Sequence, residues 1–225
     1  MEGVTDGVTL WLFDIDGTLV DTAGAGMTAL KEAAVSAFGA EGPELDLAGS
    51  TDSGLVNNLL AHFGLEGDAA TIEGFFSHYL ERLEWNLAHG GFDGRVLPGV
   101  TVLLDQLGAN KAATVGLLTG NTAGGAAVKM RHYGLDHHFG FGAYGCDHAD
   151  RNRLGPVALE RAAAETGRNF TPGDTLVIGD TPKDIACAHA MGARCLAVAT
   201  GSFSAEQLRA AGADGVVEGF EELFD

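Results

Sequence analysis

The feature that most constrains the fold of this chain is an alternation of short apolar runs with helix-like segments. The apolar runs beyond residue 100 lie at 113–120, 139–145, 174–180, 193–200 and 215–217. Helix-like segments lie before and between them, near 100–108, 123–132, 156–166, 183–190 and 204–211. This order is typical of a parallel β-sheet that is covered by helices on both faces. The run TLWLFD at 9–14 is short for a helix and predicts one more buried strand.

Residues between about 24 and 90 follow a different pattern. Apolar side chains recur there at helical spacing, for example at Met27, Leu30 and Phe38, and no convincing strand interrupts them. A Gly- and Pro-bearing segment at 90–99 then leads back to the alternating pattern. We therefore predict an α/β fold in two domains. A Rossmann-like parallel-sheet core comprises residues 1–20 and 93–225, and a small all-α helical bundle comprises residues 21–92.

The charge balance limits the partners of the chain. Its 225 residues include 13 Lys and Arg against 31 Asp and Glu, which gives a formal net charge of −18 at pH 7. Nucleic acid is not expected as a partner, because binding it requires a basic surface. No apolar run reaches the roughly 18 residues of a membrane span, and the acidic start MEGVTDG differs from a signal peptide. We therefore expect a cytoplasmic protein with no membrane contact.

Polar side chains follow three of the predicted strands, at the point where each strand ends. They are Asp14 and Asp16, Thr119 and Asn121, and Asp180 and Asp184. Because the carboxyl ends of parallel strands meet at one edge of a sheet, we expect these side chains to lie together. Carboxylates gathered in such a crevice repel one another unless a hard cation lies between them, and Mg²⁺ with oxygen ligands fits this role. The sequence thus predicts a Mg²⁺ site at this edge.

The first of these pairs has the spacing that phosphoryl transfer needs. An ionised Asp14 beside a cation can attack phosphorus, because the cation offsets the repulsion between carboxylate and phosphate. Asp16, two residues further along, can protonate the leaving oxygen and later take a proton from water. Gly17 gives the turn the conformational freedom to direct Asp16.

These motifs resemble those of the haloacid dehalogenase superfamily, in order and spacing, over nearly the full length of the chain. The first motif is DIDGT at 14–18, the second is TGN at 119–121, and the fourth is GDTPKD at 179–184. The resemblance implies that Asp14 forms an aspartyl-phosphate and that Thr119 binds phosphoryl oxygens. It implies that Mg²⁺ is held by Asp14, Asp180 and the backbone carbonyl of Asp16, with Asp184 as a further candidate ligand. The remaining candidates for phosphate binding are Gly17, Thr18, Gly120 and Asn121.

The third motif departs from the family pattern, which has a lysine in a K-P-x-P segment. The corresponding segment at 147–162 reads DHADRNRLGPVALERA. Counting from Pro156 assigns Arg153 to the lysine position, and Arg151 is the alternative. Either arginine keeps the positive charge and adds a planar fork for phosphate oxygens, so phosphoryl chemistry survives the change. Which arginine serves is open, and we expect Arg153→Ala to cost more activity than Arg151→Ala.

The helical insert is similar to the four-helix cap found at this point in one branch of the superfamily. There the cap closes over the site and shapes substrate choice, and closure would exclude water and order the leaving group. Candidate hinges are 21–26 and 90–94. The polar run at 50–53 has two interpretations, because it can face the site or supply the N-cap of a helix, and the second is favoured.

We therefore expect a Mg²⁺-dependent phosphatase of small phosphorylated metabolites, similar to phosphoglycolate phosphatases, that is a monomer or a homodimer. A sugar-phosphate mutase of the β-phosphoglucomutase type shares all the core motifs. A dehalogenase would not need the acid Asp16, and a phosphonate hydrolase would need a cap lysine, for which Lys31 is the only candidate. A non-catalytic binding or regulatory protein on the same fold is the alternative from another class.

Overall fold

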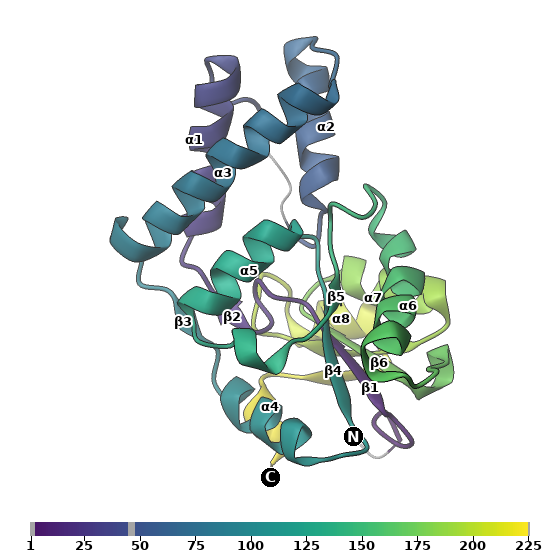
Figure 1. Cartoon of the computed structure of the whole chain (residues 1–225). Coiled ribbons are helices and arrows are strands. Elements are labelled where there is room, and N and C mark those ends of the chain that lie inside the picture. Colours follow the sequence, from purple (N-terminus) through teal and green to yellow (C-terminus); the bar gives the residue numbers. More distant parts are fainter. Residues whose placement is uncertain (1–2, 45–47, 225) are drawn as a thin grey trace.

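A computed structural model describes residues 3–44 and 48–224. Its centre is a six-stranded parallel sheet in the order β5-β4-β1-β6-β7-β8 (Figure 1). The strands are β1 Leu10–Phe13, β4 Thr114–Leu118, β5 Gly142–Ala143, β6 Thr175–Gly179, β7 Arg194–Val198 and β8 Gly215–Val217. These strands correspond to the six predicted apolar runs, so the predicted α/β fold with a parallel sheet is confirmed.

Helices cover both faces of the sheet, which explains why its strands are apolar on both sides. On β1, Phe13 packs in one buried cluster together with residues of α4 (Val100–Ala109) and α5 (Ala123–His132). Leu10 and Leu12 pack in a second cluster on the opposite face. That face is covered by α6 (Leu154–Thr166), α7 (Pro182–Met191) and α8 (Ala205–Ala210). The sheet therefore has no solvated face, and its polar groups gather at the strand ends.

Local sequence signals explain where the helices beside the strand ends begin. Thr181 is the N-cap of α7 and forms a capping box with Asp184, and Pro182 occupies the first turn. Thr122 caps α5 by accepting a hydrogen bond from the backbone N–H of Gly125. Four short 3₁₀ turns complete the described core, at Asp136–His138, Arg151–Arg153, Pro172–Asp174 and Phe220–Leu223.

Three helices form the region inserted after the first motif, and they stand above the sheet in Figure 1. They are α1 (Ala25–Phe38), α2 (Asp52–Phe63) and α3 (Ala69–His89). Their apolar faces form a cluster of their own, in which Phe38 stacks on Phe75 with ring centroids 5.6 Å apart. We refer to this region, residues 21–92, as the cap, and to the remainder as the core. The helical insert is as expected, but its described residues contain three helices instead of four.

A two-stranded antiparallel sheet at the base of the cap was not predicted. Val20–Asp21 (β2) pairs with Arg95–Val96 (β3), directly beside the two candidate hinges. The strands are two residues long, which is too short for an alternating pattern to be recognised in the sequence. Among the described residues no helix combines the length and the apolar character that crossing a membrane requires.

Candidate active site

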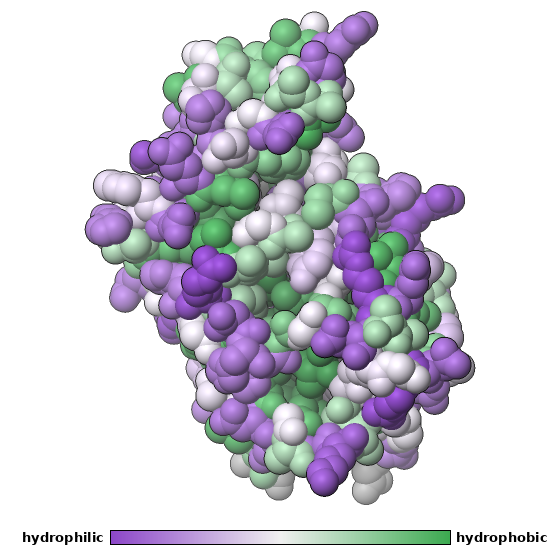
Figure 2. All heavy atoms as spheres, in the orientation of Figure 1, coloured by the Kyte–Doolittle hydropathy of each residue, from purple (hydrophilic) through white to green (hydrophobic). Residues whose placement is uncertain are grey.

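A cavity of about 460 Å³ lies where the cap meets the carboxyl ends of the strands. Its core side includes Asp14, Asp16, Gly17, Gly120, Asn121, Lys129, Arg151 and Asp180. Its cap side includes Met27, Leu30, Ser50, Asp52, Leu55 and Tyr79. In Figure 2 pale and green atoms run along the middle of the visible face, with hydrophilic purple side chains around them. The edge of the sheet predicted to carry the chemistry is therefore also the floor of this cavity.

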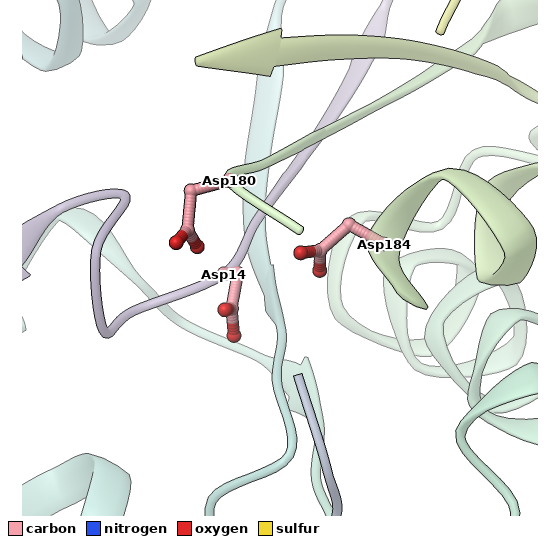
Figure 3. A group of neighbouring side chains, drawn as sticks. All are labelled: Asp14, Asp180 and Asp184. Atoms are coloured by element: carbon pink, nitrogen blue, oxygen red, sulfur yellow. The ribbon is translucent and has the colours of Figure 1, made fainter. Parts of the chain in front are cut away.

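Three buried carboxylates meet at this floor (Figure 3). Asp14, Asp180 and Asp184 each offer one oxygen, and these three oxygens lie within 4.8 Å of one another. Burial raises the pKa of Asp14 to about 6, aided by the charges of Asp184 and Asp16. Burial also raises the pKa of Asp180 to about 8, with repulsion from Asp184 and Asp14 adding to the effect. The protein thus holds carboxylates close together at a cost that a divalent cation would remove.

The backbone of the first motif is held against this cluster. Gly17 has a φ of +78°, and a Cβ built there would lie 2.4 Å from Oδ2 of Asp180. Only glycine satisfies both the left-handed backbone and the close approach. The neighbouring Thr18 is buried, and its Oγ1 donates a hydrogen bond to Oδ1 of Asp180 at 3.2 Å. The DIDGT segment and the fourth motif are therefore in direct contact.

Arg151, on the 3₁₀ turn before α6, carries positive charge into the carboxylate cluster. Its Nη2 lies 3.3 Å from Oδ1 of Asp14 and forms an ion pair with Asp184, and its side chain is 6% exposed. Burial lowers the pKa of Arg151, but Asp184 and Asp14 outweigh this effect and raise it above its ordinary value. Arg153 is exposed and does not line the cavity. The structure thus brings Arg151 to Asp14 and leaves our first choice for the third motif, Arg153, outside the site.

A second network surrounds Asp16, and sequence reasoning missed its central residue. Lys129, on α5, is 3% exposed, and its Nζ donates to both carboxylate oxygens of Asp16 at 2.8 and 2.6 Å. Lys129 also donates to Oδ1 of Asn121 at 2.7 Å, while Nδ2 of Asn121 donates to Oδ2 of Asp16 at 2.8 Å. The available signal was a lysine at helical spacing from the buried residues Gly125 and Ala126. Asp16 is thus held by two side chains of the neighbouring strand–helix unit.

The polar run at 50–53 combines the two interpretations that the sequence left open. Thr51 is the N-cap of α2, because its Oγ1 accepts a hydrogen bond from the N–H of Gly54. Ser50 and Asp52, on either side of it, line the cavity. Asp52 joins the cap to the core, because its Oδ2 accepts from the N–H of Thr122 and its own N–H donates to the carbonyl of Gly120, both at 2.7 Å. Burial raises the pKa of the Asp52 carboxyl to about 6.

The remaining sequence candidates lie as follows. Thr119 is fully buried beneath the cavity, and its Oγ1 accepts from the N–H and Nδ2 of Asn121. A hydrogen bond from Thr119 is among the effects that lower the pKa of Asp14. Lys31 does not line the cavity and forms an exposed ion pair with Glu41 at 3.8 Å. The structure therefore brings the residues of the first, second and fourth motifs together and leaves the cap lysine outside.

A family model described as haloacid dehalogenase-like hydrolase matches residues 11–198. The chain belongs to this family. The match spans the three motifs and the helical insert, so the resemblance drawn from the sequence is confirmed. The match identifies the chain as a haloacid dehalogenase-like hydrolase.

Proteins similar to this hydrolase carry different names. The 5'-nucleotidase of Pseudomonas aeruginosa is 29% identical over 199 residues, which cover 88% of this chain and 86% of that protein. The structure of CbbY from Rhodobacter sphaeroides in complex with phosphate superposes with a TM-score of 0.75 at 20% identity, covering 96% of each chain. A predicted phosphoglycolate phosphatase from Haemophilus somnus superposes with a TM-score of 0.68 at 18% identity, covering 97% of each chain. The last two likenesses show the shared fold.

Proposed function

We propose that this hydrolase is a Mg²⁺-dependent phosphatase of small phosphorylated metabolites, with a reaction like that of phosphoglycolate phosphatases. The observation that carries the proposal is the meeting of three buried carboxylates and one buried arginine at the floor of the cavity. Nε of Arg151 is the only buried side-chain polar atom without a hydrogen-bond partner among the described residues. A charged donor of this kind favours an anionic ligand.

The residues present fit a divalent metal ion. Asp14, Asp180 and Asp184 supply oxygen ligands of the kind that Mg²⁺ prefers. Burial, together with repulsion among these carboxylates, raises the pKa values of Asp14 and Asp180. We assign Asp14 and Asp180 as ligands through their side chains and Asp16 through its carbonyl, with Asp184 available as well. When bound, the ion neutralises charge on the carboxylates and on the phosphoryl oxygens.

The chemistry then proceeds in two steps on the side chains of the first motif. An oxygen of Asp14 attacks phosphorus and forms an acyl phosphate, while Asp16 gives its proton to the oxygen of the departing alcohol. Asp16 next removes a proton from water, and the water oxygen attacks phosphorus to release inorganic phosphate and restore Asp14. Lys129 and Asn121 hold the Asp16 carboxyl in place during both proton transfers.

We transfer the role of the third-motif cation from Arg153 to Arg151. The contact of Arg151 with Asp14 supports this assignment, because a cation there offsets the repulsion between the nucleophile and the incoming phosphate. Gly17, Thr18, Thr119, Gly120 and Asn121 remain our candidates for the loops that receive the phosphoryl group. The docking of the cap on the core through Asp52 supports a site that closes over its substrate.

Hydrolysis of p-nitrophenyl phosphate tests the proposal. We expect phosphate release with Mg²⁺, loss of release on chelation, and an acid-stable phosphoprotein that hydroxylamine cleaves, as an acyl phosphate requires. Absence of turnover in the presence of Mg²⁺ would favour the non-catalytic alternative. Isomerisation of a sugar phosphate that depends on an added sugar bisphosphate, without net phosphate release, would favour the mutase.

A further inference from the structure

We propose that the substrate carries its phosphate as its only anionic group, so that the alcohol released on hydrolysis is uncharged or cationic. This inference rests on the proposed phosphatase function and narrows its substrate class. It follows from a comparison of the charged side chains on the core side of the cavity with those on its cap side.

Positive charge in the cavity is confined to its core side. Among the described lining residues only Lys129 and Arg151 are cationic. Both have carboxylate partners, since Lys129 pairs with Asp16 and Arg151 pairs with Asp14 and Asp184. The residues that the structure does not describe, 1–2, 45–47 and 225, include no lysine or arginine. A phosphate beside Asp14 would therefore lie next to Arg151, and no lysine or arginine among the described lining residues lies on the cap side to receive a second anionic group.

Among the described residues, the cap side of the cavity carries apolar, uncharged polar and acidic side chains but no lysine or arginine. Met27 and Leu30 of α1 and Leu55 of α2 supply apolar surface. The acidic residues Asp52 and Asp21 also line the cavity, and Asp21 pairs with Arg95 at 3.8 Å. A carboxylate or second phosphate placed here would lose its hydration against apolar groups and be repelled by the acids. An uncharged alcohol avoids both costs, and its hydroxyl groups can donate hydrogen bonds to the acids.

The basic residues of the cap do not change this balance. The cap sequence contains Lys31 and Arg82 and no other lysine or arginine. Lys31 pairs with Glu41, and Arg82 pairs with Glu32 at 2.9 Å, and neither lines the cavity. Lys183 of the core belongs to a neighbouring cavity of about 280 Å³, where it donates to Oγ of Ser50.

The class of substrate that fits is a phosphate monoester of a neutral or cationic alcohol with some apolar surface. The volume of about 460 Å³ admits an alcohol larger than the phosphate itself. Bisphosphates and phosphorylated carboxylic acids, 2-phosphoglycolate among them, fall outside this class.

A matched pair of esters tests the inference. 2-Hydroxyethyl phosphate and 2-phosphoglycolate share a phosphate ester on a CH₂ group. They differ in the terminal group, which is an uncharged hydroxymethyl group in the first and a carboxylate in the second. With the full chain and Mg²⁺ we expect kcat/KM for 2-hydroxyethyl phosphate to be at least about tenfold higher. Equal values, or a preference for 2-phosphoglycolate, would overturn the inference.

A single positive charge on the cap should weaken the preference. Met27 is half-buried, so Met27→Lys can place an ammonium group at the cavity wall. We expect this variant to lower the ratio of the two kcat/KM values by about tenfold. The matched control is Val35→Lys on the same helix, because Val35 is 46% exposed and lies outside the cavity. The ratio should stay at the wild-type value in Val35→Lys, and an unchanged ratio in Met27→Lys would contradict the proposed wall.

Calorimetry separates failure of this inference from failure of the proposed function. Both esters are titrated into the Asp14→Asn protein with Mg²⁺, where binding is measured without turnover. Tighter binding of 2-hydroxyethyl phosphate supports the inference even if the wild type hydrolyses nothing, and that second result would refute the phosphatase function alone. Tighter binding of 2-phosphoglycolate overturns the inference in either case.

Discussion

The two sides of the cavity differ in how their side chains are bonded. On the core side Asp14, Asp16, Lys129 and Arg151 each have a charged partner in contact. The described cap side has apolar, uncharged polar and acidic side chains without a lysine or arginine, and its Asp52 is hydrogen-bonded to the core. The comparison indicates that the core determines the reaction and the cap determines the alcohol that is accepted. Changes in the core should therefore lower turnover of every ester alike, whereas changes in the cap should depend on the substrate.

The largest effect is expected for Asp14→Asn. The amide cannot form the acyl phosphate, so kcat should fall by about 10⁴-fold or more for every ester tested. The fold should persist, because the change removes a buried carboxylate whose pKa is raised to about 6. Initial rates and thermal unfolding measure the two parts of this prediction. Turnover within tenfold of the wild type would end the assignment of the nucleophile.

Arg151→Met should lower kcat by about 10²- to 10³-fold, because it removes the cation beside the nucleophile. It also leaves Asp184 buried without its charged partner, at a cost of about 3–5 kcal/mol in the free energy of unfolding. Arg151→Lys keeps the charge and should fold with intermediate activity. The control is Arg153→Met, because Arg153 is exposed. If Arg153→Met lost as much activity as Arg151→Met, Arg153 would again be the better candidate for the cation of the third motif.

Lys129→Met should lower kcat by about 10²-fold with little change in KM. Asp16 would lose the cation that contacts both of its oxygens, and its carboxyl would no longer be held for proton transfer. The loss should be equal for 2-hydroxyethyl phosphate and ethyl phosphate, two esters whose alkyl alcohols both need a proton to depart, since the residue lies on the core side. Lys111→Met, an exposed lysine of the core, is the matched control. A loss in kcat that differed between these esters would contradict the division in which the core determines the reaction and the cap determines the alcohol.

Gly120→Ala tests the junction between the two sides. A Cβ at Gly120 would lie 1.9 Å from the carbonyl oxygen of Ser50, so the cap must move away from the core. We expect kcat/KM to fall by about 10- to 100-fold, and the fall to differ between esters with different alcohols. Gly108→Ala is the control, because a Cβ there meets no atom within 4 Å. Uniform losses for all esters would show that the junction serves only the chemistry.

The smallest effect is expected for Asp52→Asn, and it concerns stability. The pKa of Asp52 is raised from 3.8 to about 6 in the folded state, so between these values the folded protein binds more protons than the unfolded chain. Stability from this group is therefore complete below about pH 4 and is lost as the pH rises through 6. The asparagine does not titrate, so the variant does not lose this stability as the pH rises. The free energy of unfolding of the variant minus that of the wild type should therefore be about 1–3 kcal/mol higher at pH 7 than at pH 4. Urea unfolding at both pH values measures the difference, and a difference independent of pH would contradict the raised pKa.

Much of the fold was predictable from the sequence, because its signals are local. The run LVI at 176–178 is apolar at every position, as is typical of a strand buried on both faces. Three of the runs end in the polar residues of a motif, so the alignment of parallel strands was sufficient to bring Asp14, Asp180 and Asp184 to one edge. The Thr181 and Pro182 signals likewise marked the start of α7.

Side chains whose role depends on contacts between distant segments were decided by the tertiary structure. Arg151 and Arg153 lie two residues apart in the same turn, and only the packing of that turn buries one and exposes the other. Lys129 meets Asp16 across 113 positions, and Asp52 meets Thr122 across 70. Local patterns specify the period of a helix or a strand, whereas the direction of a single charged side chain follows from the long-range packing that decides where burial and pairing are possible.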